Sequence, residues 1–288
     1  MRVLVTGGRG KVGSYAVNAL VAAGHRVFVT DLGAPRYGMR RIGEPSYSRA
    51  DLTDYGQAIA TIMEARVDAV VHTAGLPDPI HDPSPHVFKT NTLLNYNVAE
   101  AVCRAGVSRL IYLSSETAGG FVTAERPFRP DYLPVDEDHP ARPQDAYALS
   151  KALGENICDA LVARCDATAV SIRLSLVFAP QDYKDLVPML QRSAASASFN
   201  YWSYVDVEDV ADLIVKTVEA KTPGHEVIYA AQPDNIAGRP FMELLNELLP
   251  SGASAVRTLA REDAGGVNID KARRLFGWDP KRSWRDHV

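Results

Sequence analysis

Tyr147 and Lys151 are the two side chains of this sequence whose types and spacing most directly suggest chemistry. They stand four residues apart in Tyr147-Ala-Leu-Ser150-Lys151, and residues at positions i and i+4 project from the same face of a helix. A lysine ammonium beside a phenol favours the phenolate, so a group with a free pKa of about 10 becomes a usable base near neutral pH. The pair therefore predicts general acid/base catalysis; the alternative is two unrelated residues on a helix surface.

A glycine-rich loop lies near the amino terminus, in the run Thr6-Gly7-Gly8-Arg9-Gly10-Lys11-Val12-Gly13. Its glycines fit two registers, one starting at Gly7 and one at Gly8, and both continue through Gly10 and Gly13. Backbone N–H groups at the start of the following helix can then approach a pyrophosphate, which the helix dipole also favours. Because the loop follows a strand and opens a helix, it predicts a dinucleotide site that includes Gly7, Gly10, Lys11, Val12 and Gly13. The alternative is a glycine turn that only packs the strand on the helix.

Asp31 ends the second expected strand, eighteen residues after Gly13. That spacing is close to the roughly 20 residues expected for an acid that binds the adenosine ribose hydroxyls. A carboxylate there would repel a 2′-phosphate, so NAD is favoured over NADP as the cofactor. NADP stays the alternative because nearby guanidinium groups could accommodate the phosphate; these belong to Arg9, Arg36, Arg40 and Arg41.

Two further segments are expected to contact the cofactor. Asp51 and Leu52 follow a short strand-like run, where an acid and an apolar residue could bracket the adenine; Asp51 could equally cap the helix after Thr53. Small residues after another strand would let the backbone pass close to the cofactor; these are Thr73, Ala74 and Gly75.

These residues need a scaffold of strands and helices, and the sequence predicts one. Nearly continuous Val, Ile and Leu runs indicate buried parallel strands at residues 1–6, 25–31, 67–72, 109–114 and 169–174. Helical periodicity falls between them, at residues 12–23, 54–65, 85–105 and 146–164. This alternation predicts an α/β fold with a doubly wound parallel sheet (Rossmann) and a ligand at the carboxyl ends of its strands.

The rest of the chain is expected to form a smaller C-terminal substrate-binding lobe. We predict a cofactor domain at residues 1–175, to which residues 206–230 return, and a lobe built from residues 176–205 and 231–288. Residues 117–143 break the alternating pattern with several prolines, Pro127 among them. An irregular segment of this length beside a catalytic helix indicates a binding loop or lid; a plain surface excursion is the alternative.

Composition narrows the class of protein. A chain of 288 residues with 46% apolar residues can bury one large core, with or without a smaller lobe. The net charge of −4 gives no reason to expect nucleic acid or a membrane surface as a partner, and no run approaches the roughly 20 apolar residues of a membrane span. We interpret Cys103, Cys158 and Cys165 as reduced thiols of a cytoplasmic protein.

Taken together, the motifs resemble those of the extended short-chain dehydrogenase/reductase superfamily, which includes the NAD-dependent epimerases and dehydratases. The resemblance covers nearly the whole chain and is carried by the glycine loop, Asp51-Leu52, His72-Thr73-Ala74-Gly75, Asn91, Tyr112-Leu113-Ser114-Ser115, the Tyr147–Lys151 run, Arg173-Leu174, Val205-Asp206-Val207-Glu208-Asp209-Val210 and Phe276-Gly277-Trp278-Asp279-Pro280.

The resemblance implies a role for each matching residue. Tyr147 becomes the general acid/base, and Lys151 its electrostatic partner and a ribose ligand. Ser115 would donate to the substrate oxygen, and Asn91 would help to hold a proton-relay water. The residues expected to contact substrate are Ser115, Glu116, Tyr147, Ser175 and Trp202. No metal is expected, because the histidines His72, His81 and His86 lack a companion pattern of ligands.

Departures from the superfamily narrow the substrate. An Asn that contacts the substrate diphosphate in nucleotide-sugar epimerases and dehydratases is replaced by Ser175, and an Arg with the same task is replaced by Asn200. Losing both removes anchors that phosphate recognition normally needs, so a smaller substrate is favoured. The run from Ala141 to Lys151, followed by Gly154-Glu155-Asn156, is similar to the uronate dehydrogenase branch.

The sequence thus favours an NAD-dependent oxidoreductase that moves a hydride from a hydroxyl-bearing carbon of a sugar or sugar-acid-like substrate. A sugar epimerase with tightly held NAD, acting on a nucleotide sugar, is the first alternative, and a non-catalytic dinucleotide-sensing protein is the second. The resemblance also implies a homodimer, formed through the helices at residues 85–105 and 146–164.

Overall fold

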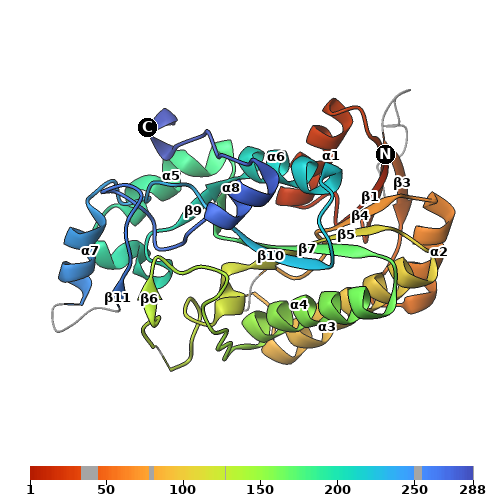
Figure 1. Ribbon diagram of the computed structural model, residues 1–288, viewed down its shortest axis with the longest axis horizontal. Coiled ribbons are helices and arrows are strands. Elements are labelled where there is room, and N and C mark those ends of the chain that lie inside the picture. Colours follow the sequence, from red (N-terminus) through yellow and green to blue (C-terminus); the bar gives the residue numbers. More distant parts are fainter. Residues whose placement is uncertain (34–44, 78–80, 127, 250–254, 288) are drawn as a thin grey trace.

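A computed structural model describes residues 1–33, 45–77, 81–126, 128–249 and 255–287. Its centre is one seven-stranded sheet with the order β10-β7-β5-β4-β1-β2-β3 (Figure 1). Every neighbouring pair in this sheet is parallel. The strands are β1 (Arg2–Thr6), β2 (Arg26–Asp31), β3 (Ser46–Arg49), β4 (Ala69–His72), β5 (Arg109–Ser115), β7 (Thr168–Leu174) and β10 (His225–Ala230). The predicted doubly wound sheet is therefore confirmed.

The sheet forms because its central strands are apolar on both faces. Every residue of β4 and β5 is buried, as expected for parallel strands that helices cover on both sides. The chain places β2 and β3 on one side of β1 and β4, β5 and β7 on the other, so the strand order reverses between β1 and β4. Ligands of such sheets bind at this reversal, outside the carboxyl ends of the strands.

Helices cover both faces of the sheet. On one face lie α2 (Tyr55–Ala65), α3 (Ser84–Arg104) and α4 (Ala146–Arg164), and on the other lie α1 (Lys11–Ala22) and α6 (Val207–Glu219) (Figure 1). Asp145 caps α4, its carboxylate accepting a hydrogen bond from the Ala148 N–H at 2.9 Å. Such a cap satisfies an end N–H and fixes where the helix begins, so Tyr147 lies in the first turn and Lys151 one turn later.

The remaining elements lie together at one end of the sheet (Figure 1). They comprise two small parallel pairs, β6 (Tyr132–Leu133) with β11 (Ala255–Val256) and β8 (Leu176–Phe178) with β9 (Tyr204–Asp206), and the helices η1 (Glu116–Gly119), α5 (Pro180–Leu190), η2 (Ala194–Asn200), α7 (Phe241–Leu248), α8 (Asp270–Phe276) and η3 (Trp284–Asp286). Residues 117–143 are partly buried: Phe121, Leu133 and Val135 belong to the hydrophobic core that the sheet and these elements share. Pro127 lies outside the described residues.

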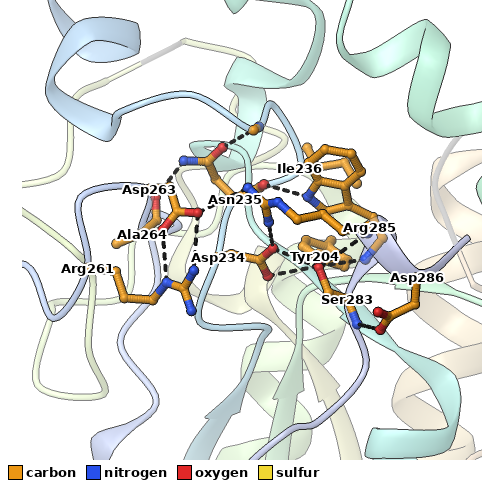
Figure 2. A network of polar contacts seen from close by, with 12 residues as sticks. Tyr204, Asp234, Asn235, Ile236, Arg261, Asp263, Ala264, Ser283, Arg285 and Asp286 are labelled. Carbon is orange, nitrogen blue, oxygen red and sulfur yellow. Dashed lines mark hydrogen bonds and ion pairs between the residues drawn. The ribbon is translucent and has the colours of Figure 1, made fainter. Parts of the chain in front are cut away.

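A polar network ties the carboxyl-terminal segment to this end of the molecule (Figure 2). Asp234 is its centre: it accepts hydrogen bonds from the Tyr204 and Ser283 hydroxyls, each at 2.9 Å, and forms an ion pair with Arg285. Arg285 also binds Asp263 at 3.0 Å. Because Tyr204 opens β9, the network fixes the loop that leads into this strand.

The prediction of three reduced thiols was wrong for Cys103 and Cys165 and right for Cys158. Cys103 and Cys165 form a disulfide with Cα atoms 5.8 Å apart, and Cys158 is a buried free thiol. Cys103 lies in the last turn of α3 and Cys165 directly follows α4. Since the two helices pack side by side, these residues meet although 62 positions separate them. No helix in the described part of the chain is long and apolar enough to cross a membrane.

Candidate active site

Two adjoining cavities lie at the carboxyl ends of the central strands. The first, of about 390 Å³, is lined by the glycine loop, by Asp31 and Leu32, by residues 50–53, by residues 73–76 and by Thr90 and Leu94. The second, of about 540 Å³, is lined by residues that include Ser115, Tyr147 and Lys151. Thr73, Gly75 and Leu76 line both cavities. One extended ligand can therefore run from the first cavity into the second.

The glycine loop is shaped by close backbone contacts. Gly7 has φ +64°, and a Cβ there would lie 2.7 Å from the Ala74 backbone; a Cβ on Gly13 would lie 2.2 Å from the Gly7 carbonyl oxygen. These positions require glycine, so the register that starts at Gly7 describes the turn. Gly7 and Gly10 line the first cavity without side chains, which leaves their backbone open to a pyrophosphate at the start of α1.

Lys11 and Val12 face the second cavity instead of the first. The Lys11 ammonium forms an ion pair with Asp182 of α5 at 2.7 Å and lies 3.4 Å from the Val177 carbonyl oxygen. The predicted cofactor residue thus also links the glycine loop to the smaller end of the molecule.

Asp31 lies at the expected end of the first cavity, where its carboxylate accepts hydrogen bonds from the backbone N–H groups of Arg9 at 3.1 Å and Gly33 at 3.4 Å. The carboxylate is therefore held at the cavity wall. Arg9 lines the same cavity, whereas Arg36, Arg40 and Arg41 lie outside the described residues.

Asp51 and Leu52 also line the first cavity. The helix-cap alternative for Asp51 was wrong, because Asp54 caps α2 by accepting the Gln57 N–H. The Asp51 carboxylate instead holds the turn that follows it, accepting hydrogen bonds from the Thr53 N–H and hydroxyl at 2.9 and 2.7 Å.

The loop of Thr73, Ala74 and Gly75 is supported from beneath by His72. Burial, reinforced by the charge of Lys151, lowers the pKa of His72 to about 3, so the ring is neutral. Nε2–H donates to the Asn95 side-chain oxygen at 3.1 Å, and Nδ1 accepts from the Thr6 hydroxyl at 2.7 Å. The Thr6 hydroxyl in turn accepts the Ala74 N–H at 3.3 Å, so the neutral ring helps to hold the loop against the ends of β1 and β4.

Lys151 lies behind Tyr147 as the helical spacing predicts. Its Nζ is 5.6 Å from the centre of the Tyr147 ring and donates to the Leu113 carbonyl oxygen at 2.8 Å. Burial lowers the pKa of Lys151 to about 8, although the negative charge of Glu155 opposes this shift. The ammonium is therefore charged at neutral pH and favours the phenolate of its neighbour.

Ser115 and Asn91 differ in what they contact. The Ser115 hydroxyl lines the second cavity and accepts the Thr117 N–H at 3.2 Å, which leaves its own O–H for donation. Asn91 is buried and binds the backbone of Leu76 through both ends of its amide, at 2.8 and 3.1 Å. It also donates to the Ser150 hydroxyl at 3.3 Å. Asn91 therefore joins the cavity-lining loop to α4.

Beneath Tyr147 and Lys151 lies a buried ion pair between Glu155 and Arg173, a contact that the sequence analysis did not predict. Glu155 accepts two hydrogen bonds from the Arg173 guanidinium, at 2.9 and 2.8 Å, and one from the Ser114 hydroxyl at 2.6 Å. These contacts join α4 to the ends of β5 and β7. The signal available in the sequence was Glu155 itself, one helical turn after Lys151.

Glu116 and Ser175 line the second cavity as expected. Glu116 is only 4% exposed, and burial raises its pKa to about 8. It accepts a hydrogen bond from the Asn200 amide at 2.8 Å. The same amide nitrogen of Asn200 donates to the Ser203 carbonyl oxygen at 2.7 Å, so the N–H groups of this amide are used behind the cavity.

Trp202 does not reach the cavity, contrary to the prediction. Its ring is fully buried, packs edge-on against Phe241 at 5.7 Å and donates to the Ala194 carbonyl at 2.7 Å. Its φ of +62° follows that of Tyr201 at +52°, and this turn directs the indole into the core. The apolar part of the cavity wall is formed instead by residues that the sequence did not single out, among them Val122, Leu176, Val177 and Phe199. Val122 and Thr123 bring the segment 117–143 to the cavity.

No group of three or more His, Cys, Asp or Glu side chains that could hold a metal ion occurs among the described residues. The first cavity does fit a dinucleotide, since its wall combines a side-chain-free glycine turn with an acid at the end of β2.

Comparison with known proteins agrees with this geometry. Residues 3–230 match the model of the NAD dependent epimerase/dehydratase family. A UDP-glucose 4-epimerase of Lactobacillus helveticus is 25% identical over 328 residues, covering 100% of this chain and 94% of that protein.

Solved structures show the same fold. MoeE5 in complex with UDP-glucose and NAD superposes with a TM-score of 0.73 at 20% identity, covering 100% of this chain and 96% of that one. A mutated uronate dehydrogenase gives a TM-score of 0.68 at 22% identity, with 100% and 85% covered. The resemblance to extended short-chain dehydrogenases/reductases is confirmed, as is the prediction of an NAD-dependent enzyme: the chain belongs to the NAD dependent epimerase/dehydratase family.

Proposed function

We propose that this protein is an NAD-dependent dehydrogenase that oxidises a hydroxyl-bearing carbon of a sugar or sugar-acid-like substrate. One observation carries the proposal: Tyr147, Lys151 and Ser115 line a single cavity that joins the cofactor cavity through Thr73 and Gly75. A substrate there would meet a base, a hydrogen-bond donor and the inner end of the dinucleotide.

The side chains divide the work between them. Bound NAD supplies the acceptor for the hydride. The Tyr147 phenolate removes the proton from the hydroxyl group on the reacting carbon, while the hydride leaves that carbon. The Lys151 ammonium stabilises the phenolate before it accepts the proton. Ser115 donates to the substrate oxygen as it becomes a carbonyl. The buried Glu155–Arg173 pair positions Lys151 and the end of β5 without contacting the substrate.

The cavity wall favours a dehydrogenase over a nucleotide-sugar epimerase. Its described lining contains two cationic side chains, Lys11 and Lys151, and both are engaged, with Asp182 and with the Leu113 carbonyl. Asn200 binds Glu116 and the backbone behind the wall. A diphosphate usually requires positively charged or bidentate partners, and neither Ser175 nor Asn200 provides them.

The epimerase alternative rests on the relatives. One curated protein that matches this chain along its full length is a UDP-glucose 4-epimerase. The same Tyr147 and Lys151 could serve a reaction in which the reduced cofactor returns the hydride to the other face of a sugar. The dinucleotide-sensing alternative is weaker, since such a protein needs neither residue.

The experiment is to follow reduced nicotinamide absorbance when the purified protein meets NAD, then NADP, with free aldoses, uronic acids and nucleotide sugars, and to separate the products by chromatography. Net NADH establishes a dehydrogenase, sugar conversion without NADH an epimerase, and neither would favour the sensing protein. The variant Tyr147→Phe should lose turnover by about 10²- to 10⁴-fold and bind NAD as before. Full activity in this variant would exclude Tyr147 as the acid/base.

We also propose a homodimer that forms through α3 and α4. These adjacent helices expose Leu93, Tyr96 and Leu149, which are 37%, 50% and 40% exposed, and neighbouring exposed apolar side chains commonly mark an interface. Sedimentation should give twice the chain mass for the wild type and the monomer mass for Tyr96→Glu. A monomeric wild type would refute this.

We also propose a division of the chain into two units and a cellular location. The division into residues 1–175 with 206–230 and residues 176–205 with 231–288 is testable by limited proteolysis. A cytoplasmic location is harder to reconcile with the Cys103–Cys165 disulfide, since reducing compartments disfavour such bonds. Thiol labelling in intact cells would decide it: labelling of both residues supports the cytoplasm.

A further inference from the structure

Five polar atoms gather behind and along one wall of the second cavity without a hydrogen-bond partner among the described residues. They are Oε2 of Glu116, Oγ1 of Thr117, Oγ of Ser175, Oδ1 of Asn200 and Oγ of Ser203. Glu116, Thr117 and Ser175 line the cavity itself. Buried polar groups are normally satisfied, and an unsatisfied one costs about 1–3 kcal/mol. A cluster of them at a cavity that also holds Tyr147 indicates that a ligand supplies the missing partners.

The geometry points to a hydroxyl-recognition subsite formed by Glu116, Ser175 and Asn200, which selects an uncharged polyhydroxylated sugar over a sugar acid or a nucleoside-diphosphate sugar. This inference rests on the proposed function, because it assigns the substrate class of the same cavity. Glu116 and Ser175 would touch the substrate, and Asn200 would position Glu116.

The hydrogen-bond inventory of the subsite suits hydroxyl groups. The amide N–H groups of Asn200 donate hydrogen bonds to Glu116 Oε1 at 2.8 Å and to the Ser203 carbonyl oxygen at 2.7 Å. The second oxygen of Glu116 and the hydroxyl of Ser175 make no hydrogen bond of good geometry within the described part of the chain, although Ser175 and the backbone of Leu176 lie close enough to Glu116 to oppose the rise of its pKa. A protonated carboxyl can donate a hydrogen bond, and a serine hydroxyl can both donate and accept. Each hydroxyl of a sugar can likewise donate and accept. Burial keeps Glu116 protonated at neutral pH, with a pKa of about 8.

An anion fits the same place poorly. The cations that line the cavity in the described ranges are Lys11, paired with Asp182, and Lys151, whose ammonium donates to the Leu113 carbonyl oxygen. An anionic group at Glu116 would lose its water there, and no described cation lies close enough to Glu116 to lower its pKa, so the loss of water is unfavourable in this buried site. An anion beside Glu116 would also be repelled by the ionised carboxylate, so it could bind only when Glu116 is protonated.

The loop behind the subsite is rigidly held, so Asn200 is preorganised. Tyr201 and Trp202 both adopt positive φ, of +52° and +62°, a conformation that costs non-glycine residues energy and persists only where the surroundings enforce it. Here the Gly266 N–H binds the Tyr201 carbonyl at 2.9 Å and the Ile236 N–H binds the Trp202 carbonyl at 3.0 Å. Tyr204, two residues on, belongs to the network around Asp234 (Figure 2).

The test measures binding of matched sugars to the NAD-loaded protein by calorimetry, with galactose against galacturonate and glucose against glucuronate, at pH 7 and pH 9. The wild type should prefer the neutral sugar at pH 7. Galacturonate should bind only while Glu116 is protonated. Because a group of pKa about 8 is mostly ionised at pH 9, the ratio of the galacturonate to the galactose dissociation constant should rise by about tenfold from pH 7 to pH 9.

Variants separate Glu116 from the other groups near it that titrate or carry charge. Tyr147 and Lys151 of α4 and Lys11 of α1 line the cavity, and the pKa of Tyr229 of β10 is raised by burial and also by the nearby charge of Glu116. Glu116→Gln keeps the shape of the side chain and leaves these groups in place. Its preference for the neutral sugar over the sugar acid should therefore not rise tenfold from pH 7 to pH 9. Ser175→Ala should weaken binding of the neutral sugar. Glu137→Gln, a partly buried acid outside the cavity, is the matched control and should behave as the wild type. Thermal unfolding of each variant verifies that it folds.

Each result decides the inference. Equal affinities at pH 7, equal widening in the wild type and Glu116→Gln, or no binding of any neutral sugar would overturn it. Binding of galactose without NADH would support the subsite and refute the dehydrogenase, whereas NADH formed from galacturonate alone would support the dehydrogenase and refute the subsite.

Discussion

The neutral state of His72 leads to a quantitative prediction about acid stability. The ring is only 2% exposed, and burial lowers its pKa to about 3, whereas the unfolded chain has the ordinary value of about 6.5. Below that value the unfolded state binds a proton that the folded state refuses, so stability falls as the pH falls. The stability is fully present above pH 6.5 and is lost progressively down to about pH 3.

The size of the effect follows from the difference in proton uptake. Each pH unit below 6.5 costs about 1.4 kcal/mol, so acidification from pH 7 to pH 5 should cost about 2 kcal/mol through His72 alone. This figure hardly depends on the folded value, because any pKa well below 5 leaves the folded ring neutral at pH 5.

The assay is urea unfolding at pH 7 and pH 5 of the wild type and His72→Gln. Glutamine can still accept from Thr6 and donate to Asn95, and it does not titrate. The variant should be less stable at pH 7 but should lose about 2 kcal/mol less than the wild type on acidification. His86→Gln, which removes an exposed histidine from α3, is the control and should lose as much as the wild type. Equal losses in the wild type and His72→Gln would refute the reasoning.

Three other predictions concern single contacts. Asp31→Ala should narrow the preference for NAD over NADP, measured as the ratio of the two dissociation constants, and an unchanged ratio would mean that other contacts set it. Removing the disulfide in the double variant Cys103→Ala/Cys165→Ala should lower the free energy of unfolding by about 4 kcal/mol, because the bond closes a long loop; dithiothreitol should destabilise the wild type but not the variant, and insensitivity of both would contradict the bond. Glu155→Gln leaves the buried Arg173 guanidinium without its carboxylate and should cost about 3–5 kcal/mol in urea unfolding. Glu247→Gln, which breaks an exposed pair with Arg239, should cost less than about 1 kcal/mol, and similar losses in the two variants would argue against the buried pair.

The scaffold was predictable because its signals are local. Runs of Val, Ile and Leu long enough to be buried on both faces mark β1, β2, β4, β5 and β7, and the glycine turn marks the start of α1. The juxtaposition of Tyr147 and Lys151 was predictable for the same reason, since the two residues share one helix and their spacing alone places them on the same face.

Contacts between distant segments were not predictable. Cys103 and Cys165 are 62 residues apart and Asn200 and Glu116 are 84 residues apart, and nothing in the sequence near one of these residues indicates the other. Trp202 shows the same limit within a short segment. An aromatic residue beside polar ones suits a cavity wall as well as a core, and only the positive φ values at Tyr201 and Trp202, which direct the indole inward, distinguish them.

Membership of the family determines the features that depend on local motifs more closely than those that depend on contacts between distant segments. The proposed acid/base pair lies on one helix, so a short local motif is enough to specify it. The proposed hydroxyl subsite needs the end of β5, the residue after β7 and the loop before β9 to meet, and a change in any one of them changes the group presented to substrate. Glu116 illustrates this: its carboxyl stays protonated only because the rest of the fold buries it, and Asn200 helps to orient it from 84 residues away. The substrate of such a protein must therefore be inferred from the packed cavity wall, while its cofactor and its proton transfer can be inferred from the motifs.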